Sequence, residues 1–262
     1  MPYATVNGLH LYYEEQGSGP PLVLLNAGTG TVDEPVYGGG WATLRPFLAQ
    51  RFRVVHVEGR GCGRTANPGG ADAYTYATLA ADAAALIEQL GLAPAHVAGF
   101  SEGGVVGLEL AVTSPTTVRS VVGVGVNYTN DAKTVAGLAG MDPGYLEQQA
   151  PETAANLARR HDPHHAPGYW RDLLRWIIAA NAEAPAYAVE DLRRIGVPTL
   201  WIVGENDSWF ELDQPLAMKQ HIPGAELLLV NHAGHGPQLT HSHLVGPAIA
   251  DFLSRNDAPS RP

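Results

Sequence analysis

VAGFSEGGVVG, residues Val97–Gly107, is the stretch that decides the fold. It reads as a short apolar strand, a tight turn with Ser101 at its tip, and then a helix of small residues. Gly99 and Gly103 flank the turn because side chains there would collide where strand and helix approach each other. We expect Ser101 to have a strained backbone that persists only if its surroundings support it. The first turn of the following helix directs backbone N–H groups at any negative charge that forms beside this serine.

Outward from this stretch, apolar runs alternate with segments of helical spacing, which predicts an α/β fold. The runs are short and continuous, as is typical of parallel strands buried on both faces. Expected strands are residues 22–25, 54–57, 97–100, 118–126, 197–204 and 226–230, and expected helices are residues 41–50, 76–90, 214–220 and 244–253. A run at residues 9–14 alternates and predicts an edge hairpin strand. The order predicts a mostly parallel, doubly wound sheet.

The pattern changes between Asn127 and Val189, where apolar strands stop and the chain becomes rich in alanine and aromatic residues with helical spacing. This change predicts a helical cap at residues 127–189, inserted into a core formed by residues 1–126 and 190–255. Residues 256–262 are predicted to be a disordered tail.

Composition narrows the class of partner. The 262 residues carry a formal net charge of −10, which disfavours binding to nucleic acid or an anionic membrane. Cys62 is the single cysteine, so an internal disulfide and a metal-thiolate cluster are excluded, and no metal or cofactor is expected. The sequence shows neither a signal-peptide pattern nor an apolar run long enough for a membrane span. We therefore expect a cytoplasmic protein, a monomer or homodimer, whose partner is a small-molecule substrate.

Candidate functional residues follow the ends of the predicted strands, where open parallel sheets place their sites. Ser101 follows the central strand, Asp207 follows a later one and His235 follows the last one. A serine hydroxyl is a weak nucleophile that needs an adjacent base, which a neutral imidazole can supply. A carboxylate can fix the imidazole tautomer and stabilise its charged form. Ser101, Asp207 and His235 are thus predicted to form a catalytic triad. Asp131 or Glu205 could replace the acid, and His232 could replace the base.

An oxyanion that forms during attack by Ser101 needs two backbone N–H donors. Glu102 is the first predicted donor, because it follows the serine, and Gly28 in the early loop is the second. The side chain of Glu102 is expected to be solvated at the helix N-terminus, where its charge suits the helix dipole.

Together these motifs resemble the α/β-hydrolase superfamily over nearly the whole chain, on the segments 22–30, 54–65, 99–104, 204–207 and 234–235. The chain order Ser, Asp, His is that of this superfamily. The family usually has His-Gly where this chain has Asn26-Ala27, and members similar to enol-lactonases carry Asn there, which favours lactones or esters. Glu58 replaces the usual Asp and Thr65 the usual Ser, and both are interpreted as structural.

The resemblance implies a serine hydrolase that cleaves an ester, lactone or thioester through an acyl-enzyme. Three alternatives remain on the same fold: a non-hydrolytic biosynthetic enzyme such as a cyclase or lyase, a C–C bond hydrolase, and a non-enzymatic ligand receptor with a vestigial triad.

Aromatic residues near the expected catalytic loops and in the cap predict an apolar or aromatic substrate. The residues expected to line the pocket are Asn26, Trp41, Tyr128, Trp176 and Trp209, and Tyr37 lies in the same stretch as Trp41. Arg159, Arg160, Arg171 and Arg175 have helical spacings that predict a solvated face.

Overall fold

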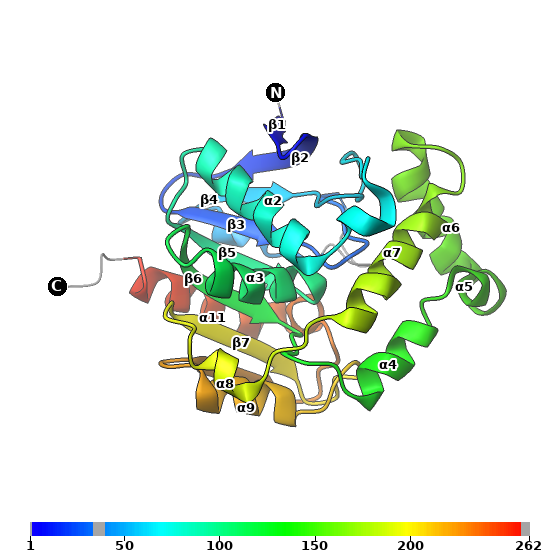
Figure 1. Cartoon of the computed structure of the whole chain (residues 1–262). Helices are drawn as coiled ribbons and strands as arrows, with labels where there is room; N and C mark the ends of the chain where they lie inside the picture. Colours follow the sequence, from blue (N-terminus) through cyan, green and yellow to red (C-terminus); the bar gives the residue numbers. More distant parts are fainter. Residues whose placement is uncertain (1, 34–39, 258–262) are drawn as a thin grey trace.

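The computed structural model describes residues 2–33 and 40–257, which form one mostly parallel sheet with helices on both faces (Figure 1). Within these residues the sheet has eight strands in the order β1-β2-β4-β3-β5-β6-β7-β8. The strands are β1 Tyr3–Val6, β2 Leu9–Gln16, β3 Pro21–Leu25, β4 Arg53–Val57, β5 Ala95–Phe100, β6 Val118–Val124, β7 Thr199–Gly204 and β8 Glu226–Val230. Only the β1–β2 and β2–β4 pairs are antiparallel among the described strands. The predicted fold class is confirmed.

The strands alternate their side chains between two apolar cores. In β3, Leu22 and Leu24 pack on one face, whereas Val23 and Leu25 pack on the other. Helices α2 (Tyr76–Gln89), α3 (Glu102–Thr113) and α9 (Asp213–His221) contribute to the core that contains Val23. Helices α1 (Arg45–Leu48) and α11 (Ser242–Arg255) contribute to the core that contains Leu22. Burial on both faces explains the continuous apolar runs.

Helices replace strands between β6 and β7. They are α4 Ala132–Ala139, α5 Pro143–Gln149, α6 Pro151–His161, the 3₁₀ helix η2 Asp162–His164, α7 Tyr169–Glu183 and α8 Val189–Leu192. Helices α4 to α7 lie together at one end of the sheet (Figure 1). An isolated bridge between Thr129 and Ala186 joins the two ends of this insertion. Leu173, Leu174 and Ile177 of α7 are buried in the same core as α3, so this helix packs directly on the sheet domain.

The ends of several elements differ from the predictions. Strand β1 was not expected, and it places β2 inside the sheet rather than at its edge. The helix expected over residues 41–50 is limited to Arg45–Leu48. Asn256 and Asp257 belong to the predicted tail, yet both form hydrogen bonds: the Asn256 side chain donates to the Phe252 carbonyl at 2.8 Å, and the Arg119 guanidinium donates to the Asp257 carbonyl at 2.6 Å. The rest of that tail lies outside the described residues.

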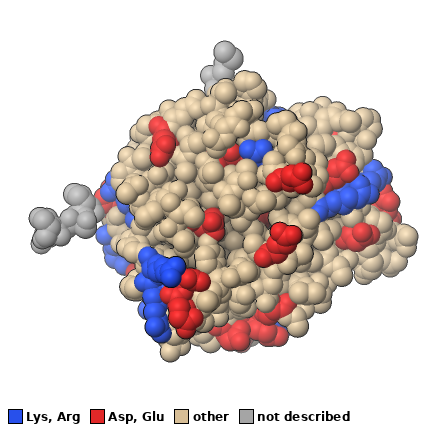
Figure 2. Space-filling model, in the orientation of Figure 1, with Lys and Arg blue, Asp and Glu red and all other residues tan. Residues whose placement is uncertain are grey.

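On the face shown in Figure 2, acidic side chains occur alone or in small groups, basic side chains gather mainly at the lower left and at the right, and larger uncharged areas separate them. No helix in the described part of the chain is both long and apolar enough to cross a membrane.

Candidate active site

A sharp turn between β5 and α3 presents Ser101. Its φ of 52° is in the left-handed region, which agrees with the strain expected for this residue. Its amide donates to the Val124 carbonyl at 2.8 Å, which anchors the turn to the neighbouring strand. A Cβ added to Gly99 would lie 2.1 Å from the Gly103 carbonyl oxygen, and one added to Gly103 would lie 2.4 Å from the Asn26 carbonyl oxygen. Glycine is therefore required at both positions for the strand, the helix and the loop after β3 to meet.

The structure brings Ser101, His235 and Asp207 into one hydrogen-bonded row. The His235 Nε2 atom lies 3.0 Å from the Ser101 Oγ atom. The His235 Nδ1 atom lies 2.9 Å and 3.1 Å from the two carboxylate oxygens of Asp207. The Asp207 side chain is fully buried, and its Oδ1 atom also accepts from the Trp209 amide at 2.9 Å. These contacts fix the carboxylate and, through it, the orientation of the imidazole.

The alternative acids and base have other partners. Asp131 is the N-cap of α4, where it accepts from the Thr134 amide at 2.9 Å and from the Glu211 amide at 2.8 Å. Glu205 accepts from the His232 amide at 3.0 Å, and the His232 side chain is 90% exposed. The structure therefore does not place Asp131, Glu205 or His232 in the row with Ser101.

A cavity of about 570 Å³ contains Ser101 and His235 in its wall, together with Gly28 and Glu102. The apolar lining comes mainly from the insertion and the loop after β7, namely Leu138, Met141, Leu146, Leu157, Leu174, Ile177, Trp209 and Phe210. Polar side chains also contribute, namely Tyr76, Asn127, Thr134, Thr153, Arg160 and Asn181. The described residues contain no group of three or more His, Cys, Asp or Glu side chains arranged to hold a metal ion.

In the wall of this cavity, the backbone of Gly28 lies beside the carboxyl group of Glu102. The loop after β3 turns back through a hydrogen bond from the Gly30 amide to the Ala27 carbonyl at 2.8 Å. The Cys62 thiol donates to the Gly28 carbonyl at 2.9 Å, which holds that peptide from behind. The buried cysteine is thus part of the loop's support.

Two predicted pocket residues lie elsewhere. Trp41 is fully buried in the same core as Leu22. Its indole N–H donates to the Leu25 carbonyl at 2.8 Å, which fixes the ring in that core. The Asn26 side chain bonds to β4, with its amide donating to the Val57 carbonyl at 3.0 Å and its oxygen 2.7 Å from the His56 Nε2 atom. Neither residue is among those that line the cavity beside Ser101, and Asn26 instead lines a smaller cavity that Glu102 also lines. Tyr37 lies outside the described residues.

In the insertion, Tyr128 and Trp176 also do not line the cavity, contrary to prediction. Both pack against the core, and Trp176 contacts the ring of Tyr169 edge-on at a centroid distance of 5.6 Å. Trp209 does line the cavity, and its ring lies 5.7 Å from that of His235.

Two side chains that lie at the cavity were misplaced in the sequence analysis. Glu102 was expected to be solvated but is only 8% exposed, and burial raises the pKa of its carboxyl group to about 7. Arg160 was placed on a solvated face, yet it lines the cavity and donates to the Thr29 carbonyl at 2.7 Å. The spacing of Leu157 and His161 on α6 could have shown which face of this helix turns inward.

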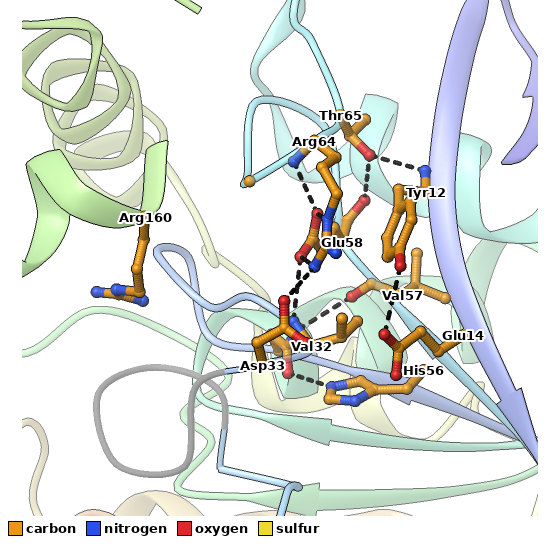
Figure 3. A network of polar contacts seen from close by, with 12 residues as sticks. Tyr12, Glu14, Val32, Asp33, His56, Val57, Glu58, Arg64, Thr65 and Arg160 are labelled. Carbon is orange, nitrogen blue, oxygen red and sulfur yellow. Dashed lines mark hydrogen bonds and ion pairs between the residues drawn. The ribbon is translucent and has the colours of Figure 1, made fainter. Parts of the chain in front are cut away.

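The segment after β4 has a supporting role. Figure 3 shows Glu58 and Arg64 paired, with Arg160 standing apart from them on the insertion. Glu58 is fully buried and accepts from the Arg64 amide at 2.7 Å and the Val32 amide at 3.2 Å. The Thr65 hydroxyl donates to the Glu58 carbonyl at 2.8 Å. These contacts agree with the structural interpretation of Glu58 and Thr65.

Comparison with known proteins identifies similar chains. A family model described as "Alpha/beta hydrolase family" matches residues 22–247. A protein of Caulobacter sp. (strain K31), named putative carbamate hydrolase RutD, is 31% identical over 279 residues, which cover 97% of this chain and 98% of the relative. A protein of Mycobacterium tuberculosis (strain H37Rv), named putative non-heme bromoperoxidase BpoC, is 39% identical over 119 residues, which cover 44% of this chain and 41% of the relative. The crystal structure of the enol-lactonase from Burkholderia xenovorans LB400 superposes with a TM-score of 0.74 at 24% identity, covering 97% of this chain and all of that one.

Proposed function

The chain belongs to the alpha/beta hydrolase family, and we propose that it is a serine hydrolase that cleaves a small ester, lactone or thioester through an acyl-enzyme on Ser101. One observation carries the proposal: the row of contacts from Ser101 through His235 to the buried Asp207, at the wall of a largely apolar cavity. The relatives named as hydrolases and the structural neighbours support an enzyme of this class.

In the first half-reaction, Ser101 Oγ attacks the acyl carbon while its proton passes to His235 Nε2. Asp207 accepts the hydrogen bond from His235 Nδ1, which keeps Nε2 free to act as base and stabilises the imidazolium that forms. The amides of Gly28 and Glu102 stabilise the oxyanion, and His235 then returns the proton to the leaving group. In the second half-reaction, water attacks the acyl carbon with His235 again as base, and the bond from this carbon to Ser101 Oγ breaks as His235 returns the proton to Oγ.

The cavity favours a small substrate with an apolar or aromatic acyl group. Its volume of about 570 Å³ is in the range of pockets for small molecules. Trp209 and Phe210 stand beside His235, with ring centroids 5.7 Å and 6.0 Å from the imidazole, so an aromatic or alkyl group can pack close to the reacting carbon. Arg160 and the titratable carboxyl group of Glu102 occupy only part of the wall.

Carbamate cleavage is the second candidate. It is favoured by the relative named putative carbamate hydrolase RutD, which aligns over 97% of this chain. A carbamate has the same acyl carbon for Ser101 to attack, so the two candidates differ in substrate rather than in the catalytic row.

A substrate panel tests the proposal. Acetate, butyrate and benzoate esters, small lactones and N-alkyl carbamates are offered to the wild type and to Ser101→Ala in ¹⁸O-labelled water. Hydrolysis by the wild type, with ¹⁸O in the acid product and loss of activity in the variant, supports the proposal. Products without ¹⁸O indicate a cyclase or lyase, and binding without turnover across the panel indicates a receptor.

A further inference from the structure

The carboxyl group of Glu102 lies beside the proposed oxyanion site. It follows Ser101 directly, begins α3 and lines the same cavity as Ser101 and His235. A Cβ added to Gly28 would lie 2.8 Å from the Glu102 Oε2 atom. The carboxyl group therefore lies against the backbone of Gly28, so it belongs to one of the two residues whose amides are the proposed oxyanion donors and touches the other.

The partners of this carboxyl group are neutral. The Tyr74 hydroxyl donates to Oε1 at 2.8 Å, and the Asn181 amide donates to Oε2 at a long 3.4 Å. Asn181 belongs to α7 and accepts from the Tyr76 hydroxyl at 2.9 Å, so the group is held from both the sheet domain and the insertion. Among the described residues, no Lys or Arg forms an ion pair with Glu102. Burial raises the pKa of the carboxyl group to about 7, and the hydrogen bonds from Tyr74 and Asn181 oppose that rise.

The other titratable groups that pack around Glu102 keep their protons near neutral pH. Burial raises the pKa values of the Tyr74 and Tyr76 hydroxyls well above their usual range, and it does the same for the Cys62 thiol. Their neutrality means that they place no negative charge beside the oxyanion site when Glu102 titrates.

Besides these tyrosines and the cysteine, four other charged or titratable groups line the cavities that Glu102 lines. Arg60 and Asp82 line the smaller cavity behind it and form an ion pair at 2.7 Å, which pairs their charges. Arg160 and His235 line the main cavity. Since Arg160 is held by the Thr29 carbonyl and by Asn156, its charge is fixed in place and does not depend on the state of Glu102.

We propose that Glu102 is a second functional acid of this site: Ser101 reacts while the Glu102 carboxyl holds its proton, and ionisation of Glu102 stops the reaction by placing a negative charge beside the developing oxyanion. The inference rests on the proposed serine-hydrolase function. Like charges close together in a buried site repel strongly, so the ionised carboxylate raises the energy of the tetrahedral intermediate. The same charge disfavours substrates that carry a carboxylate next to the reacting carbon.

The test is the alkaline side of the pH profile, measured from about pH 5 to about pH 10 as kcat/KM for a neutral ester and as the rate of labelling by a fluorophosphonate. The wild-type rate falls above the pKa of Glu102, by about tenfold per pH unit. Glu102→Gln removes the ionisation, so this fall disappears and its rate at about pH 9 exceeds that of the wild type by roughly 10-fold to 100-fold.

Two further variants make the test specific to this carboxyl group. Tyr74→Phe removes a hydrogen bond that stabilises the ionised form, so the alkaline fall moves to higher pH. Glu109→Gln is the matched control, because Glu109 lies on the same helix and also accepts from a tyrosine hydroxyl, that of Tyr187, and its alkaline fall matches the wild type.

A wild-type profile that stays flat above neutral pH while Ser101 is labelled overturns the role of Glu102 and leaves the proposed function intact. Absence of both turnover and labelling in the folded wild type at every pH overturns the proposed function itself. If circular dichroism shows that Glu102→Gln does not fold, the pH profile of Tyr74→Phe decides. A fall in its rate at the same pH as in the wild type overturns the proposal.

Discussion

The variant Asp207→Asn shows whether the Asp207 carboxylate takes part in catalysis or only accepts hydrogen bonds within its loop. In the structure, Asp207 Oδ1 accepts from the Trp209 amide and Oδ2 lies 2.9 Å from His235 Nδ1. In Asp207→Asn the single carbonyl oxygen stays with the Trp209 amide, and the new NH₂ group faces His235 Nδ1. This favours the tautomer with hydrogen on Nε2, which cannot accept the proton of Ser101. Loss of the correct tautomer lowers turnover by about 10⁴-fold, or about 5.5 kcal/mol of transition-state stabilisation.

The assay is the initial rate with the best ester of the panel under saturating conditions, with the fold checked by circular dichroism. Asp131→Asn is the control, because Asp131 caps α4 and accepts from the Glu211 amide. It should keep its turnover within a few-fold of the wild type. The reasoning is refuted if Asp207→Asn retains more than a tenth of wild-type turnover, or if Asp131→Asn shows the large loss instead.

Three other predictions follow from the packing of the site and core. Trp209→Leu should lower kcat/KM for a benzoate ester roughly tenfold more than for an acetate ester, since the ring lines the cavity; equal losses would make Trp209 a packing residue only. Arg60→Met should lower the free energy of unfolding by about 3 kcal/mol in urea titrations, because it leaves the buried Asp82 without its cationic partner, and adding Asp82→Leu should restore part of that loss. An unchanged urea midpoint in the single variant would contradict this. Burial lowers the pKa values of His56 and His161 to about 3, so the unfolded chain binds more protons below about pH 6.5 and stability should fall as pH drops from there; melting temperatures that do not change between about pH 6.5 and about pH 4 would contradict it.

Local patterns in the sequence were enough to predict the sheet and the turn at Ser101. Strands β3 to β7 are buried on both faces, so each appears as a continuous apolar run, whereas β1, with alternating exposure, was not predicted. The turn at Ser101 needs glycine at positions 99 and 103 for steric reasons, and these glycines can be recognised in the sequence next to Ser101. The positions of Asp207 and His235 after their strands followed from the topology, because the carboxyl ends of parallel strands meet at one edge.

The direction of individual side chains could not be predicted in the same way. Trp41 follows the loop after β3 in the chain, but it turns beneath the sheet to reach the Leu25 carbonyl. Asn26 reaches His56 on the neighbouring strand rather than the cavity. Glu102 is buried because Tyr74 and the insertion close over it, and contacts between segments far apart in sequence leave no local periodic signal.

Formation of an acyl-enzyme on Ser101 is the central claim, and quenched-flow mass spectrometry tests it directly. The wild type is mixed with its best ester, quenched in acid before steady state and digested, and the peptide that contains Ser101 is weighed. We predict a mass gain equal to the acyl group on Ser101, and for Ser101→Ala no mass gain and a loss of turnover of about 10⁶-fold. Rapid turnover by the wild type with no acyl group on Ser101, or turnover by Ser101→Ala above a tenth of the wild-type rate, would contradict the account.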